Sequence, residues 1–315
     1  MGFEALLGNS RLKENLKNSL KNNHISHFYL ISGPAGSGRH TLARLLAAAI
    51  LCKDPDRPCL RCPACRKVMV SSHPDFITVD DPEHKNVAVK IVREAREDMF
   101  IRPNESDYKI YLFPQELGIE GQNALLKILE EPPAYGVFML LTDNPEKLLP
   151  TVRSRCTELA LAALPDNVLR SALLREFPQA EGDAISAAIS RSGGYLGRAR
   201  ELLKGGNALM PQTEGFLQSF ASKNSLGLVQ TLAPMEKWKR DQLIPVLEQW
   251  IACLEEALCC RSGMRALHPL TRAVAERRTP QEMLQAVLHL KKAVEYAAGN
   301  VSPGAICGAL AWQLR

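Results

Sequence analysis

The chain has 315 residues, of which 46% are hydrophobic and 23% charged, as is typical of a globular protein rather than a disordered one. Its formal net charge of +5 permits nucleic acid as a neighbour but does not indicate a dedicated nucleic-acid-binding protein. No run approaches the roughly 18 apolar residues of a membrane span, and the charged, amphipathic N-terminus lacks the apolar core of a signal peptide. Nine cysteines without an export signal then indicate reduced thiols or metal ligands, so we expect a cytoplasmic protein.

The first half of the chain alternates predicted strands and helices. An N-terminal helix is expected over residues 9–22. Strands are predicted at 27–32, 75–80, 109–113, 137–142 and 157–161, with helices at 38–51, 87–100, 121–131 and 145–150. This alternation predicts a parallel sheet covered by helices on both faces.

The second half of the chain reads as helical throughout. Short helices are predicted at 166–176, 181–191 and 197–203, and longer ones at 241–260, 280–298 and 303–314. A Gly-Gly-Asn break at 205–207 separates the two groups. We therefore predict an α/β domain over 1–164, a small helical lid over 165–206 and an all-helical domain over 207–315.

A glycine-rich loop between the first predicted strand and the next helix has the context of a phosphate-binding P-loop. It reads Gly33-Pro34-Ala35-Gly36-Ser37-Gly38-Arg39-His40-Thr41. An NTPase needs Lys and then Ser or Thr after the last glycine, for the phosphates and Mg²⁺. Arg39 keeps the charge without the shape of lysine, His40 is a poor Mg²⁺ ligand, and Thr41 lies about 100° further round the helix. The residues of this degenerate nucleotide site, with ATP binding left open, are Gly33, Gly36, Gly38, Arg39 and Thr41.

Four cysteines follow the P-loop helix in the pattern C-x6-C-x2-C-x2-C: Cys52, Cys59, Cys62 and Cys65. Four thiolates within fourteen residues suit tetrahedral Zn²⁺, and such a site has no open position for water, so the zinc would be structural. His73 is an alternative fourth ligand, and four unrelated thiols in a loop are the other interpretation. The other five cysteines lie in apolar segments and are expected to be core residues.

The acidic motif of a P-loop ATPase is also missing. Such enzymes place an Asp and a second acid at the end of the third strand to hold Mg²⁺ and activate water. Here the predicted strand at 109–113 ends in Pro114-Gln115-Glu116. Proline offers no ligand and glutamine is not a base. We therefore predict no intrinsic ATPase activity.

Further motifs carry a resemblance to a known family. NALLKILEEPP at 123–133, LTDN at 141–144 and TVRSRC at 151–156 together resemble the clamp-loader branch of the AAA+ proteins. The four-cysteine insert and His73-Pro74-Asp75 are similar to the bacterial replicative clamp loader, the DNA polymerase III assembly. The damaged P-loop and acidic motif resemble its non-hydrolysing, stator-like branch rather than the gamma/tau motor subunits. The resemblance covers the whole chain in domain order, although specific motifs stop near Arg198.

The resemblance implies roles for two arginines. Arg155, of the Ser-Arg-Cys triplet, would be an arginine finger that acts in trans on ATP held by a neighbouring subunit; alone, it would read as a salt-bridge partner. Arg198 would be the lid arginine that contacts nucleotide in cis, with a structural role as the alternative. Arg153 would only support the interface.

The implied partners are gamma/tau-type and delta subunits, with the sliding clamp and primed DNA reached through the complex, in the cytoplasm at the replisome. The C-terminal helices would form an oligomerisation collar, although their apolar stripe (Leu243, Val246, Leu247, Trp250, Ile251 and Leu254) also fits any helical core. Two alternatives remain: an ATP-hydrolysing gamma/tau-type motor that uses Arg39 and Thr41, and a DNA-binding module organised by the zinc knuckle.

Overall fold

The computed structural model describes residues 2–84, 86–204, 209–261, 268–299 and 301–314. The chain separates into two compact units, the first formed by Met1–Gln179 with Ile189–Arg200 and the second by Ala180–Ala188 with Glu201–Arg315. Because this division runs through the short helices after residue 165, the three-domain division remains a prediction. The predicted break at 205–207 lies outside the described residues.

A five-stranded parallel sheet in the order β2-β3-β4-β1-β5 forms the centre of the first unit. Every residue of β1, β3 and β4 is buried, as expected for strands covered on both faces. All five strands agree with the predicted ranges to within two residues at each end. They are β1 Phe28–Ser32, β2 Phe76–Thr78, β3 Lys109–Phe113, β4 Gly136–Thr142 and β5 Thr157–Ala160.

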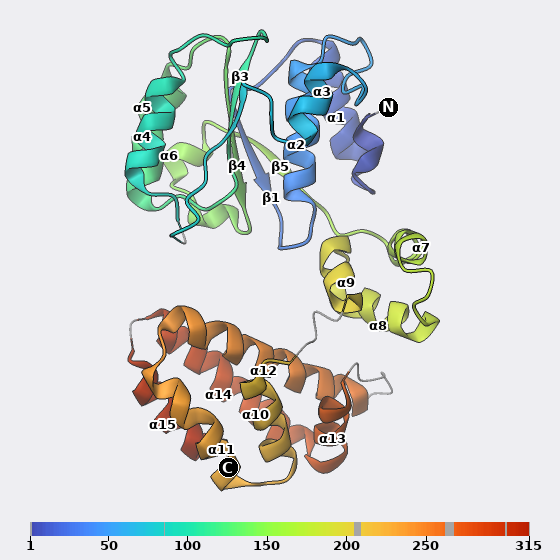
Figure 1. Ribbon diagram of the computed structural model, residues 1–315, viewed down its shortest axis with the longest axis vertical. Helices are drawn as coiled ribbons and strands as arrows, with labels where there is room; N and C mark the ends of the chain where they lie inside the picture. The colour runs from blue at the N-terminus through green and yellow to red at the C-terminus, as the bar shows by residue number, and fades with distance from the viewer. Residues whose placement is uncertain (1, 85, 205–208, 262–267, 300, 315) are drawn as a thin grey trace. The chain divides into compact units, whose positions relative to one another are not determined.

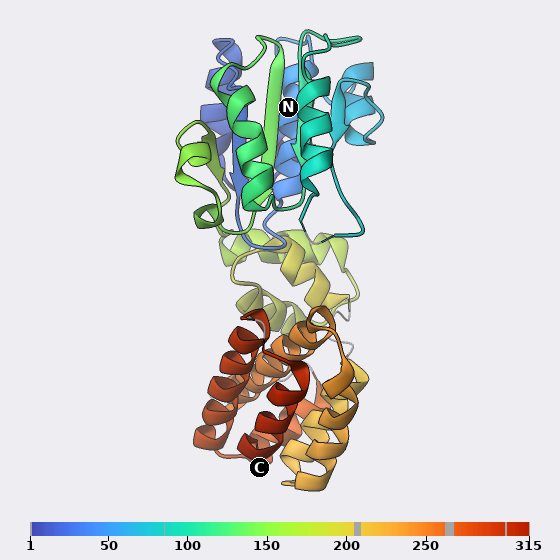
Figure 2. The same cartoon turned by 90° about the vertical axis from the view of Figure 1, so that its left-hand side faces the viewer.

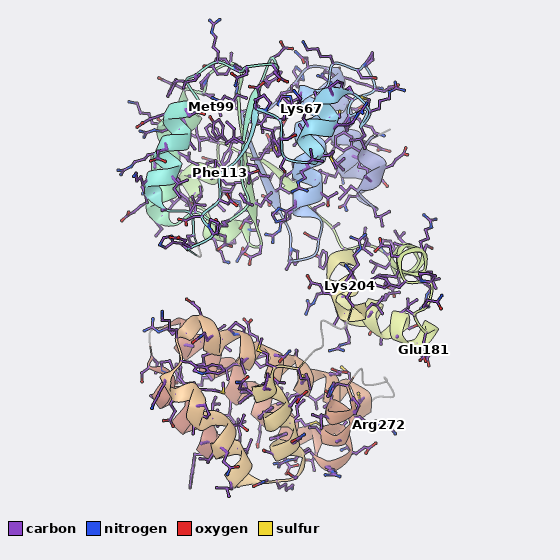
Figure 3. All side chains as sticks on the ribbon, viewed as in Figure 1. Lys67, Met99, Phe113, Glu181, Lys204 and Arg272 are labelled. Atoms are coloured by element: carbon purple, nitrogen blue, oxygen red, sulfur yellow. The ribbon has the colours of Figure 1, made fainter. Side chains whose placement is uncertain are left out.

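Helices cover both faces of this sheet (Figures 1 and 2). Side chains of β1 alternate between two cores: Tyr29 and Ile31 pack with α1 and α2, whereas Phe28 and Leu30 pack with α4 and α5. Met99 and Phe113 lie inside the second of these cores (Figure 3). One face carries α1 Ser10–Lys21, α2 Arg39–Leu51 and α3 Pro63–Met69, and the other carries α4 Val89–Asp98, α5 Ile119–Glu130 and α6 Pro150–Arg153.

The remaining short elements complete this part of the chain. The predicted helix at 145–150 is divided into η2 (Pro145–Lys147) and α6, while η1 (Gly2–Ala5) and α3 were not predicted. Three further helices, at the predicted places, are α7 Asp166–Glu176, α8 Gly182–Ser192 and α9 Leu196–Leu203. The predicted fold class is thus confirmed: a parallel P-loop α/β sheet with a four-cysteine insert, short helices after it and an all-α C-terminal part.

The second unit is helical and packs around Trp250. The indole is fully buried and stacks on Phe216, with ring centroids 4.1 Å apart. Helices α12, α14 and α15 agree with the prediction to within one residue at each end, while α10, α11 and α13 were not predicted. The elements are α10 Pro211–Ala221, α11 Ser225–Leu232, η3 Ala233–Lys237, α12 Arg240–Arg261, α13 Pro269–Arg277, α14 Pro280–Ala298 and α15 Pro303–Gln313. Within the described residues, no helix is long and apolar enough to cross a membrane.

A charged network fixes the start of α14. Thr279 and Glu282 form a reciprocal capping box, in which the Thr279 hydroxyl accepts from the Glu282 N–H and the Glu282 carboxylate accepts from the Thr279 N–H. The same carboxylate pairs with Lys223 at 2.8 Å and with the buried Arg278 at 3.1 Å. These donors, led by Lys223, lower the pKa of Glu282 to about 2.

The Glu282 network predicts a pH-dependent stability of the helical unit. The folded-state pKa of about 2 lies below the ordinary 4.5, so the carboxylate stabilises the fold above pH 4.5, and that contribution is lost as pH falls towards 2. We expect Glu282→Gln to lower the melting temperature at pH 7 and to reduce its fall between pH 5 and pH 2, as followed by circular dichroism. Glu248→Gln, at an exposed glutamate of α12, is the control. Equal pH profiles for the wild type and Glu282→Gln would contradict this account.

Candidate functional site

The four predicted cysteines come together in space. Their sulfur atoms all lie within 4.8 Å of one another, with Cys52 Sγ 3.6 Å from Cys59 Sγ and 3.8 Å from Cys62 Sγ. Tetrahedral coordination with metal–sulfur bonds of about 2.3 Å gives sulfur–sulfur edges of about 3.8 Å. The cluster can therefore hold a metal ion. His73 lies outside it, because its Nδ1 accepts the Asp75 N–H at 3.1 Å and its Nε2 lies 3.4 Å from the Ser106 hydroxyl.

Local backbone geometry orients the sulfurs. The Cys62 N–H points at Cys59 Sγ and the Cys65 N–H at Cys62 Sγ, both at 3.4 Å, as α3 begins. Hydrogen bonding, led by the Arg61 backbone, lowers the pKa of Cys59 to about 6, which favours the thiolate that a metal needs. Burial instead raises the pKa of Cys52 and Cys65. A bound metal cation would stabilise the two buried thiolates and so lower the pKa of both cysteines again.

The degenerate P-loop keeps the expected backbone. Gly36 and Gly38 adopt left-handed conformations, with φ of 77° and 99°. Gly38 is the N-cap residue of α2. Arg39, the first residue of α2, is half-buried, whereas Thr41 is exposed on the same helix. Burial lowers the pKa of Arg39, while the carboxylates of Asp143 and Glu116 act in the opposite direction. The predicted loop residues therefore lie together, except that Thr41 faces solvent.

A lysine lies between the two carboxylates nearest the P-loop. Lys147 Nζ is 2.8 Å from Glu116 Oε1, after β3, and 2.8 Å from Asp143 Oδ1, after β4. These contacts raise the pKa of Lys147 and help to lower that of Asp143. The ammonium group thus offsets one of the two negative charges and occupies carboxylate oxygens that could otherwise coordinate a divalent cation. The cavity beside this group measures about 20 Å³, which is room for about one water.

The Gln115 side chain is fully engaged in hydrogen bonds to a neighbouring loop. It accepts from the Asp81 N–H at 2.6 Å and donates to the carbonyls of Asp81 and His84, both at 3.0 Å. The residue at the usual acid position therefore bridges a surface loop. Sequence reasoning missed Lys147, for which the only signal was its i+4 spacing from Asp143.

The start of α9 approaches the P-loop closely. The Gly197 N–H donates to the Gly36 carbonyl at 2.9 Å, and a Cβ on Gly36 would lie 2.4 Å from the Arg198 nitrogen. Only glycine fits at such a contact, so the start of α9 covers this side of the loop. Arg198 itself is exposed.

Arg155 occupies the turn between α6 and β5. Its guanidinium donates to the Thr151 carbonyl at 2.8 Å and to Glu130 Oε1, at the end of α5, at 3.0 Å. The side chain is 38% exposed, so part of the fork faces solvent. Arg153 instead pairs with Glu146 at 2.6 Å and with Glu158 at 3.7 Å. Arg155 is therefore oriented by its neighbours and still accessible to solvent. Glu130, which orients it, was not singled out from the sequence.

The Lys147 bridge predicts a measurable titration. Because Lys147 is the leading cause of the low pKa of Asp143, Lys147→Met should raise that pKa by leaving Asp143 and Glu116 without the shared cation. A carboxyl-carbon NMR titration measures the change, with Lys127→Met on the exposed face of α5 as control. An unchanged Asp143 titration would show that the bridge does not form in solution.

A family model and several relatives connect the chain to DNA polymerase III subunits. The family model described as "DNA polymerase III, delta subunit" matches residues 8–165. Over 158 residues the chain is 37% identical to DNA polymerase III subunit tau of Bacillus subtilis, with 49% of this chain and 28% of that protein covered. Over 174 residues it is 33% identical to DNA polymerase III subunit delta' of Pseudomonas aeruginosa, with 54% and 53% covered. The chain thus matches about a quarter to a half of the length of these relatives.

A solved structure of a DNA polymerase III gamma subunit-related protein from Thermotoga maritima is 17% identical to this chain, with a TM-score of 0.45 and 96% and 99% of the two chains covered. The family model spans half of the sequence, including the P-loop, the four cysteines and the turn that carries Arg155. The chain therefore belongs to the DNA polymerase III delta subunit family.

Proposed function

We propose that the chain is a delta prime-type subunit of a bacterial replicative clamp loader that does not hydrolyse ATP. It would complete the pentamer with gamma/tau-type and delta subunits, so that the sliding clamp is loaded on primed DNA during replication. The observation that carries the proposal is the Lys147 bridge between Glu116 and Asp143. An ammonium group at this place opposes divalent cation binding, and hydrolysis of ATP depends on that cation.

The second part of the proposal is that Arg155 acts in trans. A guanidinium on an exposed turn, held at one side by Glu130 and the Thr151 carbonyl, can direct its remaining N–H groups towards a γ-phosphate on a neighbouring chain. Arginine fingers contribute roughly 10³–10⁵ in rate. Glu130 is then a positioning residue, and Arg198 would contact the P-loop side of the same chain.

The domain roles follow the predicted division. Residues 1–164 would form the nucleotide-binding-like body, 165–206 the lid and 207–315 the collar through which the subunits assemble. The fully buried Trp250 cluster supports a collar that folds as a compact unit.

A gamma/tau-type motor is the second candidate, favoured by the 37% identity to the Bacillus subtilis tau subunit. In that case Arg39 and Thr41 would replace the usual Lys and Ser/Thr. Steady DNA-stimulated ATP turnover by the isolated chain would identify a motor. An isolated chain that does not hydrolyse ATP, with or without DNA, would agree with the delta prime-type role.

Arg155 provides the direct test of the trans role. In a complex reconstituted with gamma/tau-type and delta subunits, we expect Arg155→Ala to reduce DNA- and clamp-stimulated ATPase by at least about tenfold, because the neighbouring site loses a fixed charge. Arg155→Lys should recover little, since an ammonium lacks the planar fork. Arg175→Ala, on an exposed face of α7, is the matched control. An intact complex with unchanged ATPase would rule out the finger.

We also propose that the four-cysteine cluster binds one structural Zn²⁺. Four thiolates at these distances match zinc, and the site has no open coordination position. The metal would hold α3 and the turn before it against α2.

Removal of a ligand tests the zinc proposal. Metal analysis should find one zinc per chain in the wild type and a loss of zinc in Cys62→Ser, together with a lower melting temperature, because metal binding contributes directly to folding. Cys259→Ser, at an exposed cysteine of α12, should keep the full zinc content. If the purified wild type contains no zinc and does not take it up, the proposal fails.

A further inference from the structure

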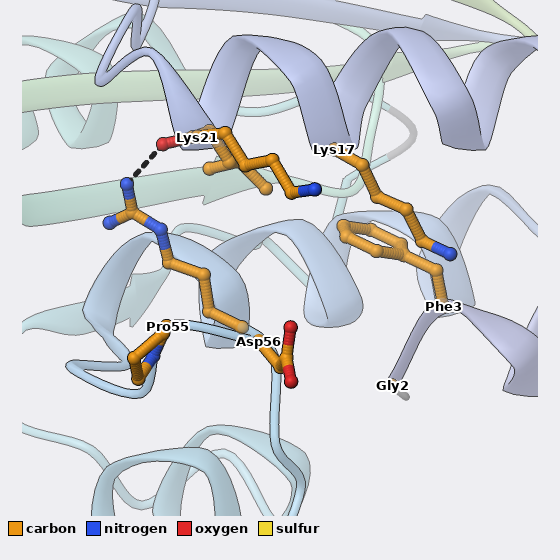
Figure 4. A pocket seen from close by; sticks show the side chains of 8 residues that line it. Gly2, Phe3, Lys17, Lys21, Pro55 and Asp56 are labelled. Carbon is orange, nitrogen blue, oxygen red and sulfur yellow. Dashed lines mark hydrogen bonds between the residues drawn. The ribbon is translucent and has the colours of Figure 1, made fainter.

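A basic cavity lies between the N-terminal segment, α1 and the cysteine insert (Figure 4). Its volume is about 140 Å³. This is about ten times the space that one water needs but is smaller than the roughly 300–1,000 Å³ of a site for a whole small-molecule ligand. The lining residues are Gly2, Phe3, Lys17, Leu20, Lys21, Pro55, Asp56 and Arg57.

The charges on the wall are unbalanced. Lys17, Lys21 and Arg57 are basic and Asp56 is the one acidic lining residue. Among the described residues, none of these four forms an ion pair, whereas Arg61 and Lys67 nearby are paired with Asp54 and Glu105. Figure 4 shows Lys17 and Lys21 extending from α1 on the side that faces Asp56. The wall therefore has two positive charges that no neighbouring carboxylate neutralises.

One of the three basic groups, Arg57, is held in place before a ligand arrives. Arg57 Nη2 donates to the carbonyl of Leu20 at the end of α1 and lies 3.5 Å from Asn23 Oδ1, which leaves Nε and Nη1 without a hydrogen-bond acceptor in the described residues. The same carbonyl also accepts the Asn23 N–H at 3.1 Å, so it has two donors at the end of α1. The ligand would thus meet one anchored guanidinium and two ammonium groups.

The apolar part of the wall is equally fixed. Phe3 is 1% exposed and lies beside the stem of Lys17 (Figure 4). Gly2 approaches the insert so closely that a Cβ would lie 2.2 Å from the Pro58 carbonyl oxygen. The turn from Pro55 to Arg57 lies between Cys52 and Cys59. Because these two cysteines belong to the cluster, the cluster constrains the position of Arg57.

We propose that this cavity binds the phosphate group of a phosphorylated ligand. A phosphate monoester carries about −1.5 to −2 charges at neutral pH and three acceptor oxygens, which match two uncompensated positive charges and three donor groups. A single carboxylate would leave one positive charge unmatched. Phe3, Leu20 and Pro55 would contact the group that bears the phosphate. The source is either a nucleic-acid strand end or a free phosphorylated metabolite, and the site is separate from the P-loop after β1.

The test uses the 315-residue chain, purified with zinc, and two probes. Inorganic phosphate is titrated by ¹⁵N NMR, and a 5′-phosphorylated single-stranded oligonucleotide by fluorescence anisotropy, with the unphosphorylated oligonucleotide as reference. We expect saturable shifts of the Lys17, Lys21 and Arg57 signals. The double variant Lys17→Gln/Lys21→Gln should weaken phosphate binding about tenfold or more, because two charge-assisted contacts are lost.

Two control variants isolate the cavity. Lys127→Gln removes an exposed charge on α5 and should leave binding unchanged, while Arg39→Gln removes any contribution of the P-loop. If the phosphorylated oligonucleotide displaces inorganic phosphate and the unphosphorylated one does not, the site binds nucleic-acid strand ends. If inorganic phosphate saturates the site and neither oligonucleotide displaces it, the site binds a free phosphorylated metabolite. Absence of saturable shifts at these three residues with both probes would overturn the proposal, as would equal weakening in Lys127→Gln.

Discussion

The parallel pairing of the sheet is the constraint on which the candidate site depends. Strand β1 lies between β4 and β5 and is buried throughout, and all pairings are parallel. The carboxyl ends of the strands therefore meet at one edge, where the P-loop follows β1, Glu116 follows β3 and Asp143 follows β4. Residues more than 100 positions apart in sequence meet there because the strands run the same way.

At that edge, the chain has the geometry of a phosphate site but different charges. A working site needs two acids to hold a metal that faces the nucleotide, whereas here Lys147 bridges Glu116 and Asp143, and Gln115 bonds to the Asp81 loop. The same positions thus hold two carboxylates that share one ammonium group. Arg155 lies on a different, exposed turn and is oriented by Glu130.

The cysteine insert organises a second region of the same unit. Its chain between Cys52 and Cys65 is short and offers few large apolar residues, so a metal would supply the cohesion that a hydrophobic core usually provides. The insert places Pro58 against Gly2 and Arg57 against the end of α1. One local cluster therefore shapes a surface built from the N-terminus, α1 and the insert.

The sequence by itself determined the five strands, most of the helices and the local motifs. Buried strands, glycine turns and CxxC spacing are short-range patterns, so the five strands, the four-cysteine cluster and the degenerate P-loop could be predicted. Only the tertiary structure decided which distant charges meet: Lys147 with Glu116, Glu130 with Arg155, and Lys17 with Arg57 around one cavity. The physical reason is that an ion pair depends on distances of a few ångströms between side chains, and these follow from strand order and helix packing.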